Sequence, residues 1–313
     1  MQLLLPNRSA KTQEGDNMNT NVLCEFKKIL LNTMYNFDKF CVQNNLQYFA
    51  CSGTAIGAVR HKGFIPWDDD IDIFMPRKDY NKLVAMRHEL KASGYAIKNL
   101  GDDEYIYAFA KFYDINTTLI ETDSFPNCLL GVYLDIFPLD EVDGTLDEIK
   151  NKKEIYTSAY RKFQDTFLSL SMRQFISCLY HKDFTRLKEL LMLLVQTKNK
   201  KKEIRTKFKQ IEDNWAEERG VKLMTHSGIY ALDKELFDKS WFSKSIRVPF
   251  ENIQINIPKE YDKYLSHLYG DYMVLPPLEK RVSMHPHFYL NLKEGLTLKD
   301  VERRIQKGEH LVY

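Results

Sequence analysis

Four aspartates within five positions, followed directly by apolar residues, are the feature of this chain that most restricts its fold. Residues 67–74 read Trp-Asp-Asp-Asp-Ile-Asp-Ile-Phe. In an extended strand successive side chains point to opposite faces, so Asp68, Asp70 and Asp72 would share one face. Neighbouring carboxylates on that face would lie about 6.8 Å apart and repel by about 2.4 kcal/mol at an effective dielectric constant of 20. The pattern therefore predicts a strand whose acidic face is neutralised by a hard divalent cation, Mg²⁺ or Mn²⁺.

Two other interpretations of the acidic segment explain it less well. A solvated acidic loop is the commonest setting for clustered aspartates, but it has no use for the surrounding apolar residues, which are Ile65, Pro66, Trp67, Ile71, Ile73, Phe74 and Met75. A calcium loop of the EF-hand type matches the first three ligand positions. It then requires glycine where Ile73 stands and glutamate where Asp79 stands.

The composition excludes several classes of protein. The chain has 313 residues, 44% hydrophobic and 28% charged, which is enough for one large globular domain or two modest ones. The net charge of +2 does not indicate nucleic-acid binding, and we expect no nucleic-acid partner. The five cysteines are scattered and form no Cys-x-x-Cys pair, which is typical of proteins in the reducing cytoplasm.

Residues 1–20 are predicted to be a flexible tail. Leu3-Leu4-Leu5 is their only apolar run, and it is too short for a signal peptide or a membrane span. Met18 is an alternative start of translation. We therefore expect a cytoplasmic protein, with a peripheral position on the inner face of the membrane as a further option.

Helices and strands are expected to alternate along most of the chain, which predicts an α/β (α+β) fold with a mixed sheet flanked by helices. Apolar spacing predicts helices at Phe26–Cys41, Ala55–Arg60, Tyr80–Leu90 and Tyr261–Leu268. Strands are predicted at Tyr48–Cys51, Tyr95–Leu100, Ile106–Tyr113, Thr117–Glu121, Val132–Phe137 and Ile253–Ile257, in addition to the acidic strand.

A long stretch in the middle of the chain differs from the rest. From Thr145 to Arg219 there is no proline or glycine and the apolar residues are periodic, so residues 141–220 are predicted to be a helical insert. It contains a basic run made up of Lys198, Lys200, Lys201, Lys202, Arg205, Lys207 and Lys209. This run is either a solvated helix face or a contact with an anionic membrane surface or a pyrophosphate-linked lipid.

Asp135 is the fourth candidate acidic position of the site. Apolar neighbours on both sides place it in a buried strand, where a lone carboxylate is costly without a partner. Phosphoryl-type transfer with two metal ions needs carboxylates from neighbouring strands. Asp70, Asp72 and Asp135 are therefore the predicted catalytic residues, and these three together with Asp68 are the predicted ligands of two Mg²⁺ or Mn²⁺ ions.

A short glycine-containing turn precedes the acidic segment. Ser52-Gly53-Thr54 lies between a predicted strand and a predicted helix, where backbone N–H groups can receive a phosphate. A simple helix cap explains these residues equally well. The cationic side chains that follow, Arg60, His61 and Lys62, would balance the charge of a diphosphate and add weight to the phosphate interpretation.

Three separated motifs carry a family resemblance. They are residues 52–72, from Ser52 to Asp72, residues 133–140, which read Tyr-Leu-Asp-Ile-Phe-Pro-Leu-Asp, and residues 269–277, which read Tyr-Gly-Asp-Tyr-Met-Val-Leu-Pro-Pro. In this order they resemble the LicD family, the bacterial relatives of the fukutin-type transferases. The resemblance covers most of the chain and is weakest over the helical insert.

The resemblance implies a nucleotidyltransferase-like fold and the transfer of a phosphorylated alcohol such as phosphocholine. The donor would be a CDP-alcohol such as CDP-choline, and the acceptor a sugar hydroxyl of a cell-surface glycan (lipopolysaccharide, capsule or teichoic acid) or of a lipid-linked oligosaccharide. It implies metal binding by Asp68, Asp70 and Asp72 and places Gly53 and Thr54 beside the donor phosphates. Ser52, Arg60, His61 and Lys62 complete the predicted donor-binding group on the N-terminal side. Arg281 and His285 follow the Leu-Pro-Pro segment as in similar sequences and are predicted to bind either the donor phosphate or the acceptor.

The same resemblance suggests a division of the chain. Residues 21–140 would be the nucleotidyltransferase-like core, and residues 221–313 a C-terminal α/β extension that completes the active-site cleft. Two alternatives stay open. Asp68-x-Asp70 and Asp70-x-Asp72 also fit the Asp-x-Asp motif of sugar-nucleotide glycosyltransferases, and the chain could be a non-catalytic subunit for glycan assembly.

Overall fold

The computed structural model describes residues 20–122, 127–167, 183–217, 219–282, 287–309 and 311–312. Its helices are α1 (Thr20–Gln43), α2 (Ser52–Ile56), α3 (Arg77–Ala85), α4 (Arg87–Leu90), α5 (Leu146–Asp165), α7 (Phe184–Glu217), α8 (Leu232–Glu235), α9 (Tyr261–Tyr269) and α10 (Leu298–Gln306). Its strands are β1 (Phe49–Ala50), β2 (Asp72–Pro76), β3 (Tyr95–Lys98), β4 (Ala110–Asp114), β5 (Thr118–Ile120), β6 (Tyr133–Val142), β7 (Lys222–Met224), β8 (Phe237–Asp238), β9 (Ser245–Phe250), β10 (Ile253–Pro258), β11 (Tyr289–Asn291) and β12 (Leu311–Val312).

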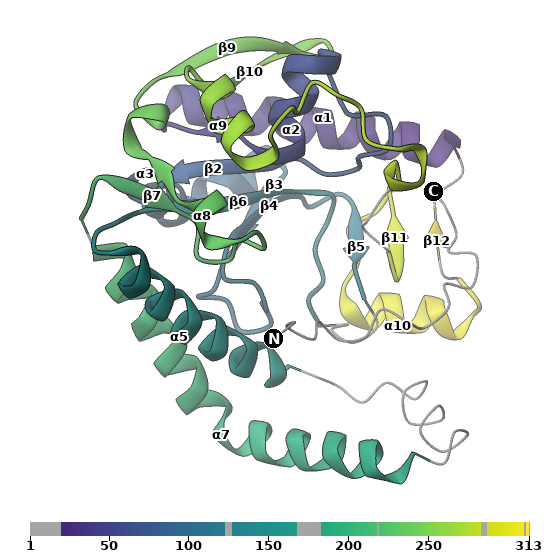
Figure 1. The fold of residues 1–313 in the computed structure, drawn as a ribbon. Helices are drawn as coiled ribbons and strands as arrows, with labels where there is room; N and C mark the ends of the chain where they lie inside the picture. The colour runs from purple at the N-terminus through teal and green to yellow at the C-terminus, as the bar shows by residue number, and fades with distance from the viewer. Residues whose placement is uncertain are drawn as a thin grey trace.

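A mixed sheet forms the centre of the molecule (Figure 1). Its strands lie in the order β1-β2-β6-β4-β3, with β7 and β8 attached to the far end of β6. Strands β2 and β6 are parallel, while β4 is antiparallel to β6. The predicted mixed sheet flanked by helices is therefore confirmed.

Helix α1 shows why the periodic apolar residues of the sequence form a core. Phe26, Leu30, Met34, Phe37 and Cys41 follow one helical face, and all five are buried in the main hydrophobic cluster. The same cluster takes in the inward-facing residues of β1, β2, β4 and β6. The helix predicted at Phe26–Cys41 is confirmed.

The helical insert is a pair of long helices, α5 and α7, that pack against each other beside the sheet (Figure 1). Aromatic residues fill their interface, with the rings of Tyr156, Phe163 and Phe208 in contact. The N-terminal part of α7 projects from the body at the bottom of the view. No helix within the described ranges has the length and apolar character needed to cross a membrane.

A buried ion-pair network ties the insert to the sheet. The Arg77 guanidinium contacts the Asp140 carboxylate at 2.5 and 2.6 Å and Glu212 of α7 at 3.3 Å. His226 Nε2 lies 3.1 Å from the second oxygen of Asp140. Burial alone would raise the pKa of Asp140, but the hydrogen bonds from Arg77 and His226 hold it well below its ordinary value.

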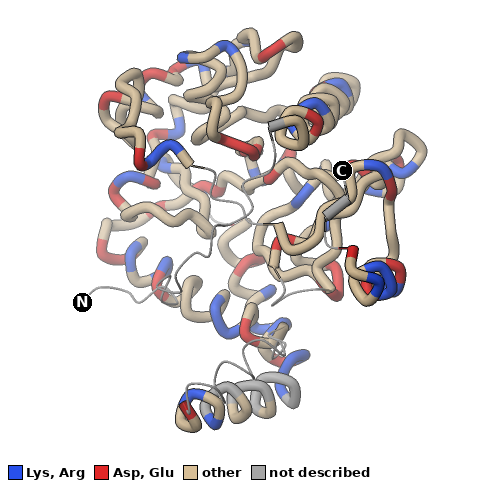
Figure 2. The backbone as a smooth tube through the Cα atoms, turned by 90° about the vertical axis from the view of Figure 1, so that its right-hand side faces the viewer, with Lys and Arg blue, Asp and Glu red and all other residues tan. Residues whose placement is uncertain are grey.

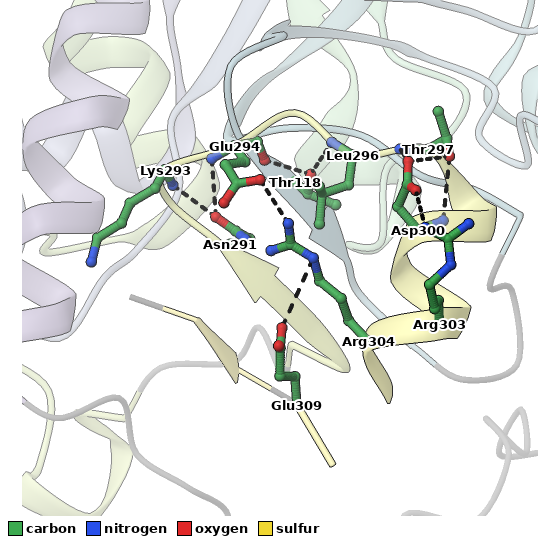
Figure 3. Close-up of polar contacts among 10 residues, drawn as sticks. All are labelled: Thr118, Asn291, Lys293, Glu294, Leu296, Thr297, Asp300, Arg303, Arg304 and Glu309. Atoms are coloured by element: carbon green, nitrogen blue, oxygen red, sulfur yellow. Dashed lines mark hydrogen bonds and ion pairs between the residues drawn. The ribbon is translucent and has the colours of Figure 1, made fainter. Parts of the chain in front are cut away.

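The C-terminal residues form a small sheet, β12-β11-β5, covered by α10 (Figure 3). Thr118 Oγ1 donates to the carbonyl of Glu294 and accepts from the N–H of Leu296, both at 2.8 Å. Thr297 and Asp300 form a capping box at the start of α10. These contacts fix a C-terminal segment of the chain against β5, which comes more than 150 residues earlier in the sequence.

Several predicted element boundaries are wrong. The acidic strand begins at Asp72 and not at Asp68, because residues 66–71 form a turn and loop in which the N–H of Asp68 donates to the carbonyl of Ile65 at 3.0 Å. Lys27 fixes this loop with hydrogen bonds to the carbonyls of Ile65 (3.3 Å) and Pro66 (3.1 Å).

Three other boundaries differ from the prediction. Helix α2 begins at Ser52, before the predicted start at Ala55, and continues as a π-helical turn, Gly57–His61. The strand predicted at Ile106–Tyr113 is only Ala110–Asp114, whereas β6 extends beyond Phe137 to Val142. The predicted domain limit at residue 140 consequently falls inside a strand.

Candidate active site

A cavity of about 350 Å³ lies at the edge of the sheet where β2 begins. Its lining residues are Ser52, Gly53, Ile56, Asp68, Asp70, Asp72, Phe74, Phe137, Thr225, Ser227, Gly228, Ile229, Tyr230, Glu235, Phe237, Leu268 and Tyr269. The three alternate aspartates therefore border one space, although only Asp72 belongs to a strand. The cavity also joins the start of α2 to segments more than 150 residues away in the sequence.

Gly53 permits the close approach of the acidic loop to α2. A Cβ atom at this position would lie 2.5 Å from Oδ2 of Asp68, well inside van der Waals contact. The buried hydroxyl of Thr54 accepts a hydrogen bond from the N–H of Asp72 at 2.9 Å. Thr54 thus fixes the first residue of β2 relative to α2.

Ser52 has an unusual backbone conformation. Its φ angle is +47°, in the left-handed region that costs energy for a residue other than glycine. Its N–H donates to the hydroxyl of Tyr264 on α9 at 3.0 Å. Tyr264 therefore holds the Ser-Gly turn in place, and sequence reasoning missed it because the two residues are far apart in the chain.

Asp135 lies beside Asp72 but belongs to a second polar cluster. The two residues are register partners on the parallel strands β2 and β6. On the other side, the register partner of Asp135 on β4 is Lys111, whose ammonium lies 2.7 Å from Asp135 Oδ1 and 3.0 Å from Glu121 Oε1. Burial raises the pKa of Asp135 to about 6, against the opposing influence of the Lys111 charge. The cavity lining does not include Asp135.

Lys111 was also missed by sequence reasoning. It is almost fully buried, and its ammonium lies over the rings of Tyr133, at 3.4 Å, and Tyr107, at 4.6 Å. The hydroxyls of these two tyrosines both donate to Glu121. The sequence did contain a signal for this buried lysine, because Lys111 falls inside the mostly apolar strand predicted at Ile106–Tyr113.

The predicted cationic residues lie around the acidic loop rather than in the cavity. Arg60 Nη1 donates to the carbonyls of Tyr272 (2.6 Å) and Val274 (3.2 Å). The guanidinium of Arg281 lies 5.4 Å from the ring centre of Trp67. Burial, followed by the charge of Arg281, lowers the pKa of Arg60, so the two guanidinium groups interact.

The remaining predicted donor-binding residues have local contacts. His61 packs edge-to-face against Trp67, with ring centres 6.3 Å apart, and Lys62 Nζ donates to the carbonyl of Val59 at 3.0 Å. His285 lies outside the described residues. The structure therefore places His61 and Arg281 against Trp67, with Arg60 close to both. Lys62 contacts only its own turn in the bonds described above.

The acidic lining suits a hard cation. Carboxylate oxygens are the donors that Mg²⁺ and Mn²⁺ prefer, and Mg²⁺ usually takes one or two protein carboxylates and completes its shell with water and substrate phosphates. In the part of the chain that the structure describes, no group of three or more His, Cys, Asp or Glu side chains is arranged to hold a metal ion. One or two of the cavity carboxylates would serve as protein ligands of such an ion only if water and phosphate oxygens completed its shell.

Parts of this chain are similar to known proteins. Residues 45–181 match the sequence model of the LicD/FKTN/FKRP nucleotidyltransferase domain, a range that contains Ser52, the acidic loop and Asp135. The lipopolysaccharide cholinephosphotransferase LicD of Haemophilus influenzae is 29% identical over 273 residues, which cover 84% of this chain and 96% of that protein.

Two rickettsial proteins described as uncharacterised match a shorter region. One from Rickettsia typhi is 31% identical over 141 residues, covering 41% of this chain and 45% of its own length. One from Rickettsia prowazekii is 29% identical over 143 residues, covering 41% of this chain and 53% of its own length.

Proposed function

We propose, from the premise that this chain carries a LicD-family nucleotidyltransferase domain, that it moves a phosphorylated alcohol from a CDP-alcohol donor to a sugar hydroxyl of a cell-surface glycan. Phosphocholine is the proposed group, because the relative that is similar over 84% of the chain is a lipopolysaccharide cholinephosphotransferase. The observation that carries the proposal is the cavity in which the Ser-Gly turn meets Asp68, Asp70 and Asp72.

The proposed reaction is an in-line displacement at phosphorus. The acceptor oxygen forms a bond to the phosphorus that carries the alcohol, the bond from that phosphorus to the bridging oxygen breaks, and CMP leaves. The hydroxyl proton passes to a carboxylate. Asp72 is the better acceptor of this proton, because it borders the cavity, whereas Asp135 is paired with Lys111.

The residues around the reacting groups would mainly bind and orient them. Asp68, Asp70 and Asp72 would hold Mg²⁺ or Mn²⁺, and the bound ion would neutralise charge on the donor diphosphate. Gly53 leaves room for the Asp68 carboxylate beside α2. Arg60 donates to the carbonyl of Val274 and Arg281 lies over the ring of Trp67, so both place positive charge beside the acidic loop.

A direct assay tests this function. Purified protein with Mg²⁺, CDP-choline and the native glycan should release CMP, and Asp70→Asn should abolish the release because a cavity carboxylate is lost. Asp103→Asn is the matched control, since Asp103 is a highly exposed aspartate that pairs with Arg205. Normal turnover by Asp70→Asn, or transfer from nucleotide sugars without transfer from CDP-alcohols, would overturn the proposal.

We further propose that the N-terminal part of α7 contacts an anionic membrane surface. This contact would bring the enzyme to an acceptor carried on the membrane. Phe184, Leu191, Met192 and Val195 are exposed apolar residues on this part, and with Leu187 and Lys188 they line a groove. Residues 184–202 contain six Lys or Arg and one Glu, and Figure 2 shows basic positions along this arm. By contrast Arg205, in the predicted basic run, is bound to Asp103 and to the carbonyl of Gly101.

A further inference from the structure

The cavity has an aromatic end that the phosphate chemistry does not use. Its lining includes five aromatic residues, Phe74, Phe137, Tyr230, Phe237 and Tyr269, and Tyr269 also hydrogen-bonds Ser52. The titratable acids among the lining residues are Asp68, Asp70, Asp72 and Glu235, and no Lys, Arg or His is among the described residues that border the space. Aromatic walls and acidic surroundings together favour a cationic ligand.

Two tyrosines from different parts of the chain meet at this end. Tyr230 lies in the loop between β7 and α8, and Tyr269 is the last residue of α9. Their ring centres are 5.7 Å apart at an interplanar angle of 86°, and their hydroxyls lie 3.5 Å apart. Tyr230 is 41% exposed, so part of this ring is accessible from outside the fold.

A buried carboxylate holds the loop that carries Tyr230. Glu235 Oε1 accepts from the N–H of Tyr230 at 2.7 Å, and Oε2 is paired with Lys153 of α5. A Cβ atom on Gly228 would lie 2.3 Å from Oε1 of Glu235, so the loop packs directly on this carboxylate. Both oxygens of Glu235 are therefore engaged, and the lining beside the aromatic rings also includes Thr225 and Ser227.

We propose that the Tyr230–Tyr269 pair binds the quaternary ammonium of the transferred alcohol phosphate; this inference rests on the proposed function. A quaternary ammonium has no hydrogen-bond donor, so the faces of aromatic rings recognise it through cation–π attraction. A primary ammonium is more strongly hydrated and requires hydrogen-bond acceptors. The pair therefore selects a choline phosphate over an ethanolamine phosphate, while the acidic end of the cavity takes the diphosphate.

Calorimetric titration of the full chain in Mg²⁺ with CMP, CDP-choline and CDP-ethanolamine tests the inference. Replacing Tyr269 with leucine removes one ring, and we expect this variant to bind CDP-choline about 2- to 30-fold more weakly, from the usual range of cation–π strengths, with CMP binding unchanged. The preference for CDP-choline over CDP-ethanolamine should fall by the same factor. Tyr269→Phe keeps the ring and should behave as the wild type.

Tyr230→Leu provides a second variant, because the partly exposed Tyr230 side chain can be shortened even if Tyr269→Leu does not fold. Parallel weakening of CMP and CDP-choline would show that the rings stack on the base and would overturn the inference. An unchanged preference for choline in both leucine variants would also overturn it. If the wild type binds neither CMP nor CDP-choline, the proposed function fails as well, so the two failures are distinguishable.

Discussion

At the scale of single residues, the site depends on close contacts that an additional Cβ atom would disturb. Gly53 and Asp68 are the clearest case, since the missing Cβ leaves room for a carboxylate oxygen. Ser52 adds a strained backbone conformation that Tyr264 holds from another element. Strain of this kind persists only where the surroundings enforce it, and it is often found at functional sites.

Gly53→Ala is expected to displace the Asp68 carboxylate from α2 while leaving the fold intact. The variant should bind Mn²⁺ in the presence of CMP at least several-fold more weakly than the wild type, because one cavity carboxylate is moved. Titration followed by Mn²⁺ electron paramagnetic resonance measures this change. Gly101→Ala is the control, because the nearest atom to its new Cβ is a side-chain oxygen of Asn99 at 3.2 Å, far from the cavity. Equal Mn²⁺ binding by both variants would contradict the role given to Gly53.

At the scale of elements, buried ion pairs attach neighbouring helices and strands to one another. Asp140 near the end of β6 receives Arg77 from α3 and His226 from the loop after β7, and Arg77 also reaches Glu212 of α7. Removing one member leaves a buried charge without compensation, which typically costs about 3–5 kcal/mol. The helical insert is therefore held to the sheet by charge as well as by aromatic packing.

Asp140→Asn is expected to lower the free energy of unfolding by about 3–5 kcal/mol at pH 7. The folded-state pKa of Asp140 is depressed, so its stabilisation is fully present above the ordinary carboxyl pKa near 4. It declines as the pH falls below that value toward the folded-state pKa. Urea unfolding should consequently show a smaller difference between wild type and variant at pH 3 than at pH 7.

The exposed pair Glu203–Lys207 on the same helix supplies the control for this experiment. Its side chains are mostly solvated, so Glu203→Gln should leave the urea midpoint unchanged. A difference between wild type and Asp140→Asn that stays the same at both pH values would show that the lost packing, and not the lost charge, destabilises the variant.

At the scale of the whole molecule, the catalytic candidates and the proposed membrane contact lie in different parts of the fold. The cavity lies where β2 begins, whereas the apolar groove lies on the N-terminal part of α7. Figure 1 shows that this part of α7 projects from the body of the molecule. The whole chain has a net charge of only +2, so the excess of basic residues in residues 184–202 is local. A surface contact through this arm leaves the cavity to receive the donor from solution.

Sedimentation with lipid vesicles tests the role of α7. The wild type should bind vesicles that contain phosphatidylglycerol and lose this binding as salt is added, because exposed charges are screened. The double variant Leu191→Gln/Val195→Gln should bind several-fold more weakly, since it loses apolar contact with the bilayer. Ile155→Gln, an equally exposed apolar position on α5, should bind as the wild type does. A result in which the double variant still binds fully, or in which vesicles of phosphatidylcholine alone bind as well, would reject this contact.

Much of the fold was predictable because local patterns decide it. The spacing of Phe26, Leu30 and Met34 predicted α1, and the alternation of Ile253, Ile255 and Ile257 predicted β10. The boundary errors arose where distant contacts decide the backbone. Lys27 holds the loop before β2, and no pattern within the acidic segment indicates that contact.

The sequence by itself determined the mixed α/β class, the LicD-family resemblance that the comparisons confirm and the identity of the acidic cluster, because these depend on residue types and short spacings. The assignment of Asp68, Asp70, Asp72 and Asp135 as metal ligands stays a prediction. Only the tertiary structure decided that Tyr264 supports Ser52, that Lys111 pairs with Asp135 and that Tyr230 and Tyr269 meet in the lining of the cavity. Such contacts join residues from separate strands and helices, and their geometry is fixed by sheet register and helix packing, which no local pattern contains.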